Sequence, residues 1–117
     1  MAVHTGKRPA DLPDDMNPAD ESVFWVSWEE ALNGYSMDTS SWILPDGFTE
    51  LSTVFNVVSD PDENGETYPN SNGIQISTSL ENGTYYIGNQ ITYTNTNFNP
   101  SITVTLQRGF NLTIDNV

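Results

Sequence analysis

The chain has 117 residues, a length that supports one domain with a single modest hydrophobic core. Sixteen Asp and Glu residues outnumber three Lys and Arg residues, and the net charge of −13 argues against nucleic acids and anionic membranes as partners, because both carry negative charge. The sequence contains no cysteine, which excludes disulfides, a thiolate nucleophile and a cysteine-ligated zinc site.

Residues 1–21 predict an extended N-terminal arm without a core of its own, because three prolines and five acidic residues stand among few apolar ones. Two interpretations remain open, a disordered tail and an arm that orders against a neighbouring subunit. For the second, the candidate partner-binding residues are Lys7, Arg8, Pro9 and Pro13. No apolar stretch follows the two basic residues, so the segment does not have the form of a secretory signal peptide.

Three strands are predicted between residues 22 and 59. Residues 23–28 are rich in aromatic and β-branched side chains, which favour a strand. Residues 29–34 predict at most one helical turn closed by a glycine, and residues 40–44 a short strand ended by a Pro-Asp-Gly turn. Partial alternation over residues 49–59 indicates the third strand.

Alternation of apolar and polar residues becomes regular in the second half of the chain. It predicts strands at residues 74–77, 85–93 and 102–114, a hairpin turn at Asn82-Gly83, another turn at residues 95–100 and a bulge at Arg108-Gly109. No helical period lasts longer than one turn. The sequence therefore predicts an all-β fold, a single Ig-like antiparallel β-sandwich of six to seven short strands over residues 22–117.

The residues available for catalysis argue against an enzyme. The only histidine, His4, lies in the predicted arm, so a Ser-His-Asp set or a histidine-ligated metal would have to form there. Carboxylates that are sequence neighbours, such as Asp14-Asp15 and Glu29-Glu30, point to opposite sides of an extended chain and make no acid–base pair.

The acidic loop DPDENGETYPNS, residues 60–71, resembles the start of a calcium-binding loop. Asp60, Asp62 and Asn64 occupy the first three ligand positions of an EF-hand, and Gly65 the turn position. Serine stands where the bidentate glutamate belongs, and the flanking segments are predicted strands. A polar loop built from turn dipeptides is the favoured interpretation, with a calcium site as the alternative; no other cofactor is expected.

The three tryptophans raise the possibility of sugar stacking. Trp25 and Trp28 are three residues apart, so a regular strand would direct them to opposite faces and place at least one in the core. Trp42, between Ser41 and Ile43, is also more typical of a core anchor than of an exposed platform.

The order of several motifs resembles that of short Ig-like β-sandwich structural proteins of tailed bacteriophages. The motifs are the first aromatic strand, the DTSSW and PDGF segments, the NGTY and ITYT runs, and the closing RGFNLTI, and together they cover roughly residues 22–114. The resemblance implies a non-enzymatic virion protein. The loop at residues 60–71 and the turn at residues 95–100 differ from the family pattern. Because loops commonly determine which partner a protein binds, these differences concern the partner surface.

These observations lead to the expectation of a capsid decoration or cement protein, made in the host cytoplasm and added to the virion. It would bind the major capsid protein or another virion protein through its arm and a sheet edge, and would form a homo-oligomer on the particle. The alternatives are a neck or tail-fibre component and a carbohydrate-binding module. No nucleic-acid or membrane partner is expected.

Overall fold

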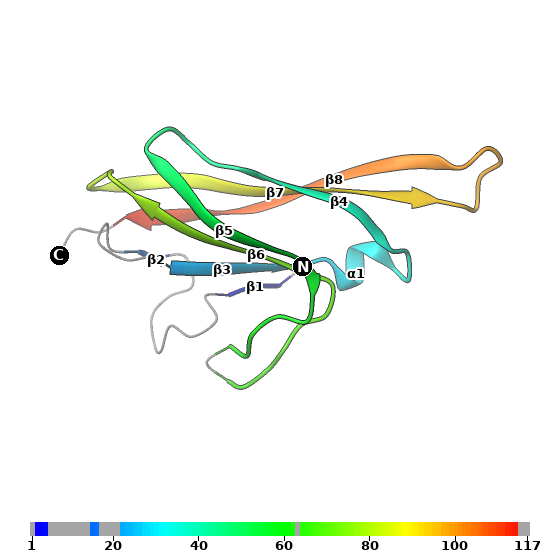
Figure 1. Ribbon diagram of the computed structural model, residues 1–117, viewed down its shortest axis with the longest axis horizontal. Helices are drawn as coiled ribbons and strands as arrows, with labels where there is room; N and C mark the ends of the chain where they lie inside the picture. The colour runs from blue at the N-terminus through cyan, green and yellow to red at the C-terminus, as the bar shows by residue number, and fades with distance from the viewer. Residues whose placement is uncertain (1, 5–14, 17–21, 63, 115–117) are drawn as a thin grey trace.

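The computed structural model describes residues 2–4, 15–16, 22–62 and 64–114, and forms two layered β-sheets (Figure 1). The first sheet has the strand order β1 (Ala2–His4), β3 (Ser22–Ser27), β6 (Ser71–Thr78), β5 (Phe48–Val57). The second has the order β2 (Asp15–Met16), β8 (Ile102–Ile114), β7 (Gly83–Asn95), β4 (Met37–Ile43). The pairs are antiparallel except β2 with β8, and the predicted β-sandwich is confirmed.

Two of these strands lie within the predicted arm. The short β1 pairs with β3 and the two-residue β2 pairs with β8, so both contact the domain to which they are attached. The candidate contact residues Lys7, Arg8, Pro9 and Pro13 lie outside the described residues.

The hydrophobic core lies between the sheets because alternate residues of each strand point inward. One cluster contains buried residues of β3, β6, β7 and β8: Phe24, Ile74, Ile76, Ile87, Leu112 and Ile114. A second cluster fills the other end with Val26, Trp28, Leu32, Met37 and Ile91. The single-turn helix α1 (Glu29–Leu32) contributes Leu32 to this second cluster, and the predicted turn ends with Asn33 in the left-handed conformation, one residue before the expected glycine.

The predicted Asn82-Gly83 hairpin is wrong. Strand β6 pairs with β3 and β5, whereas β7 pairs with β4 and β8, so the chain crosses between sheets at this point. The crossover from β4 to β5 lies beside it, because Thr78 Oγ1 and Ser79 N both donate to the Gly47 carbonyl, at 2.8 and 3.1 Å. Local turn residues do not tell a hairpin from a sheet-to-sheet crossover.

Strands β7 and β8 form a hairpin longer than the short strands predicted, with 13 residues in each (Figure 1). Their register is continuous from the Gly83–Ile114 pair to the Asn95–Ile102 pair, so the predicted bulge at Arg108-Gly109 is also wrong. Gly109 instead lies directly opposite Gly88 in the regular ladder. The turn expected at residues 95–100 is the tip of this hairpin, and its Asn99–Pro100 peptide is cis.

Candidate interaction surface

The carboxylate of Asp62 holds the acidic loop between β5 and β6 together by hydrogen bonds within the loop. Asp62 Oδ1 accepts hydrogen bonds from the backbone N–H groups of Asn64 and Glu66, at 2.9 and 3.0 Å, and Oδ2 accepts one from the Tyr68 hydroxyl at 2.9 Å. The hydrogen bond to Asp62 raises the pKa of Tyr68 above its ordinary value. These hydrogen bonds are those expected of a polar loop in which the Asp62 side chain bonds to nearby backbone groups.

The other two positions of the calcium alternative do not join Asp62. Asp60 lines a hollow on the outer face of the first sheet, and Asn64 contributes its backbone N–H to the loop. Among the described residues, no group of three or more His, Asp or Glu side chains is arranged to hold a metal ion.

The tryptophans follow the expected division between faces, and none offers a fully exposed ring. Trp28 is completely buried in the core and Trp25 is 4% exposed on the outer face of the first sheet. Trp42 is half-buried against both core clusters. Trp25 and Trp28 are therefore too deeply buried for a sugar ring to stack on them, whereas Trp42 is partly accessible.

A buried amide network links the two sheets, and sequence reasoning did not identify it. Asn89 Oδ1 accepts hydrogen bonds from Trp28 Nε1 at 2.8 Å and from Asn72 Nδ2 at 2.9 Å. Asn89 Nδ2 donates to Ser40 Oγ and to the Ser41 carbonyl, both at 2.9 Å. Because both amides are fully buried, these bonds replace the water that each group loses on folding. The network fixes how β4, β6 and β7 meet.

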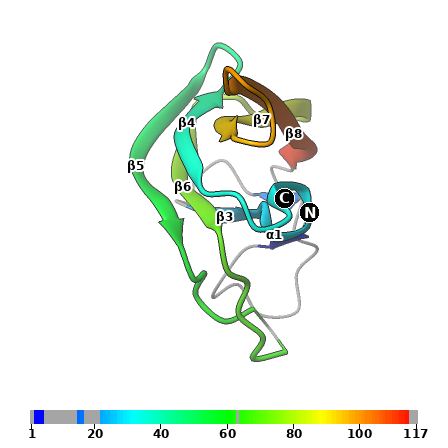
Figure 2. The same ribbon diagram turned by 90° about the vertical axis from the view of Figure 1, so that its right-hand side faces the viewer.

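The most distinctive surface is the β5 edge, which we define as residues 51–58. Strand β5 ends the first sheet and pairs only with β6 among the described strands. Four of the eight large apolar side chains exposed in the described residues lie here: Leu51, Val54, Phe55 and Val58, which are 40–62% exposed. Only Glu50 in β5 carries a charge. Figure 2 shows this strand along the margin of the sandwich.

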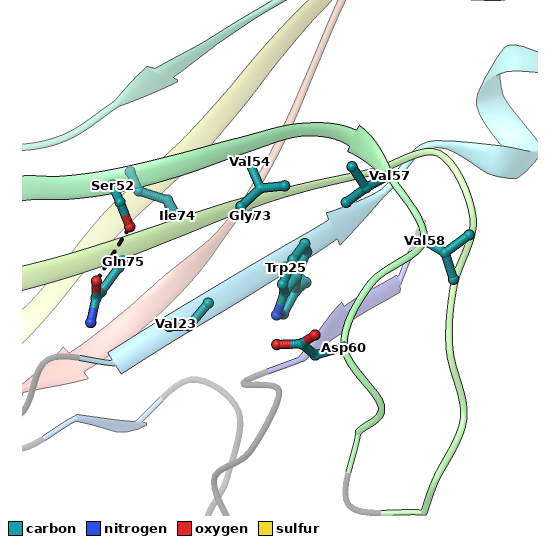
Figure 3. Close-up of a pocket in the computed structure, with 10 residues that line it drawn as sticks. All are labelled: Val23, Trp25, Ser52, Val54, Val57, Val58, Asp60, Gly73, Ile74 and Gln75. Atoms are coloured by element: carbon teal, nitrogen blue, oxygen red, sulfur yellow. Dashed lines mark hydrogen bonds between the residues drawn. The ribbon is translucent and has the colours of Figure 1, made fainter.

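A hollow of about 330 Å³ lies next to the β5 edge on the outer face (Figure 3). Gly73 and Trp25 both line it, and the Trp25 ring lies directly over Gly73, because a Cβ at that position would lie 2.8–3.0 Å from atoms of the ring. Trp25 and Val54 are the register partners of Gly73 on either side, so the absence of a side chain at Gly73 lets the indole pack across β6 between β3 and β5. The lining is mainly apolar, with Ser52, Gln75 and Asp60 as its polar members.

The strand edge and the hollow together form a surface suited to an extended polypeptide. Unpaired backbone groups of an edge strand accept a further strand, and a neighbouring pocket receives its alternate side chains. Register shifts between Glu50 and Ser52 and between Val54 and Val57 limit how far such pairing can run without interruption. Side-chain contacts with the apolar residues would therefore carry much of the binding.

Comparisons of the chain with protein-family models, curated proteins and solved structures gave no match. Within the described residues, no helix has both the length and the apolar character needed to cross a membrane.

Proposed function

We propose that this protein is a non-enzymatic virion structural protein that decorates or cements a phage head shell. The observation that carries the proposal is the β5 edge, where four exposed apolar side chains lie on a sheet margin to which no further described strand is paired. Soluble proteins ordinarily protect such margins with charges or cover them, so an apolar open edge is typical of a binding surface. The motif order of residues 22–114 supports the choice of a virion partner.

The proposed occupant of the β5 edge is an extended segment of the major capsid protein. Its backbone would pair with β5, and one apolar side chain would enter the hollow over Trp25. A net charge of −13 opposes close packing of copies through their acidic segments, so the nearly uncharged β5 edge would face the shell, with Asp60 of the acidic loop at the border of the contact. The arm would supply a second contact.

A small interface of this kind suffices on a particle. Shell proteins repeat by symmetry, and contacts that are weak singly gain strength when a decoration protein joins neighbouring positions on the lattice. The same surface would serve a neck or tail-fibre component, which differs in the partner and in the number of copies on the particle.

The test is binding to shells that lack this chain, followed by sedimentation. We expect the wild type to sediment with the shells and Phe55→Lys to bind at least tenfold more weakly, because a lysine ammonium buried without a partner in an interface costs a few kcal/mol. Ile102→Lys is the matched control: its side chain is 45% exposed against 47% for Phe55, and it lies on the β7–β8 hairpin.

Because both variants gain the same charge, the difference between their shell affinities reports the effect of the position of that charge. Equal binding of Phe55→Lys and the wild type would exclude the β5 edge as the contact. Failure of the wild type to bind shells would argue against decoration, and the same assay with purified tail and neck complexes would then test the alternative.

A further inference from the structure

A second surface, distinct from the β5 edge, lies on the outer face of the second sheet and centres on Tyr86. Its ring rests on a pair of glycines: a Cβ on Gly88 would lie 2.8 Å from Cε2 of Tyr86, and one on Gly109 would lie 2.6 Å from its Cζ and hydroxyl oxygen. Gly88 and Gly109 are directly paired across β7 and β8. The glycines therefore allow the ring to lie down on the sheet.

This position leaves the opposite face of the ring open to solvent. Tyr86 is 41% exposed although one side of its ring is packed against backbone. The hydroxyl accepts a hydrogen bond from Gln107 Nε2 at 3.3 Å, which helps to hold the ring in place. Ile43, the register partner of Gly88 on β4, is 38% exposed and extends the apolar platform by one side chain.

Amide and hydroxyl side chains surround the platform. Asn111 lies directly across from Tyr86. Gln107 precedes Asn111 by four residues on the same face of β8, so their backbones are roughly 13 Å apart at the rise of an antiparallel strand. Gln90 pairs with Gln107. Each carboxamide offers both a donor and an acceptor, which matches a pair of neighbouring hydroxyls that also donate and accept.

The outward positions of β7 and β8 carry no charge in a chain with 16 acidic residues. They alternate with the buried Ile87, Ile91 and Leu112, and consist of Thr, Tyr, Gly, Gln and Asn. An anionic ligand would be repelled by the remainder of the molecule. Two exposed apolar side chains are also too few for a stable protein–protein interface, which buries about 800 Å² on each partner.

From these features we propose that the Tyr86 platform binds a sugar ring of a neutral glycan. The C–H face of the sugar would stack on the open face of Tyr86, and its hydroxyls would hydrogen-bond to Gln107 and Asn111, in the usual combination of an apolar contact with a few orienting polar groups. The site is shallow, so we expect a Kd of about 1 mM. This proposal stands independently of shell binding.

The test is a titration of the ¹⁵N-labelled protein with cellohexaose, maltohexaose and chitohexaose, followed by amide chemical shifts. At least one of these neutral glycans, at about 10 mM and so tenfold above the expected Kd, should shift the amides around Tyr86, Gly109 and Asn111. Absence of shifts with all three glycans, or shifts confined to other surfaces, would overturn the proposal.

Variants sharpen the result. Tyr86→Ala should raise the Kd at least tenfold, whereas Thr103→Ala, which changes an exposed threonine on the same face nearer the hairpin tip, should leave it unchanged. Equal affinity of Tyr86→Ala and the wild type would also overturn the proposal. If Tyr86→Ala does not fold, the wild-type shift map decides the question alone.

Discussion

Replacing Asn89 with alanine should destabilise the protein more than any surface substitution, because this residue connects both sheets from a fully buried position. The change removes the only acceptor described for Trp28 Nε1 and an acceptor for Asn72 Nδ2. Asn72 Nδ2 retains a contact with Met37 Sδ at 3.2 Å, which is a weaker acceptor.

The size of the stability loss follows from the two buried donors, Trp28 Nε1 and Asn72 Nδ2, that lose their acceptor. A buried donor that loses its partner costs about 1–3 kcal/mol, so the free energy of unfolding should fall by roughly 2–4 kcal/mol once the remaining sulfur contact is considered. A domain of this size has a total stability of about 5–15 kcal/mol, and the melting temperature should fall by roughly 10 °C or more.

Urea unfolding followed by tryptophan fluorescence measures this loss. Ser40→Ala is the control, because Ser40 accepts a single bond from the same amide and Asn89 Nδ2 keeps its bond to the Ser41 carbonyl. We expect the control to cost less than about 1 kcal/mol. A loss below about 1 kcal/mol for Asn89→Ala would refute the view that the network contributes to stability, since it would mean that the stranded donors find other partners.

Three further predictions follow from the same contacts. Gly109→Ala should cost about 1–3 kcal/mol and more than Gly88→Ala, because its Cβ would meet the Ile87 carbonyl at 2.3 Å whereas that of Gly88 first meets the movable Tyr86 ring; equal losses in urea unfolding would contradict this ranking. Tyr68→Phe should be less sensitive to alkali than the wild type: the folded pKa of Tyr68 is raised, so its contribution is complete below about pH 10 and is lost as the pH rises through that folded pKa. If the unfolding free energies of Tyr68→Phe and the wild type fall equally with pH above about pH 10, Tyr68 makes no such contribution. The melting temperature in about 1 mM calcium should equal that with a chelator, because the Asp62 oxygens already accept hydrogen bonds within the loop. A higher melting temperature with calcium would support the calcium-site alternative.

The strands were predictable from sequence wherever one face of the sheet is buried. Alternation placed Ile87, Ile91, Leu112 and Ile114 on one side of β7 and β8, and the structure buries all four. The same parity placed Asn89 between Ile87 and Ile91, so the sequence contained the signal for a buried amide. Its partners, Trp28 and Asn72, lie 61 and 17 residues away and no local pattern joins them.

Strand order was not predictable, because turn residues act locally. Asn82 and Gly83 favour a tight change of direction, but whether the next strand joins the same sheet depends on the packing of the core between the sheets. The exposure of the β5 edge depends on that order too, because β5 lies at the end of the first sheet and has β6 as its single described neighbour. The candidate surface therefore became visible only with the sheet topology.

The central claim is that this chain is a stoichiometric part of a virion. The most direct test is its copy number in purified virions, measured by quantitative mass spectrometry against the major capsid protein. We expect a ratio near one or another simple fraction set by the shell lattice. A few copies per particle would indicate the neck or tail, and absence of the chain from the particles would contradict the proposed function.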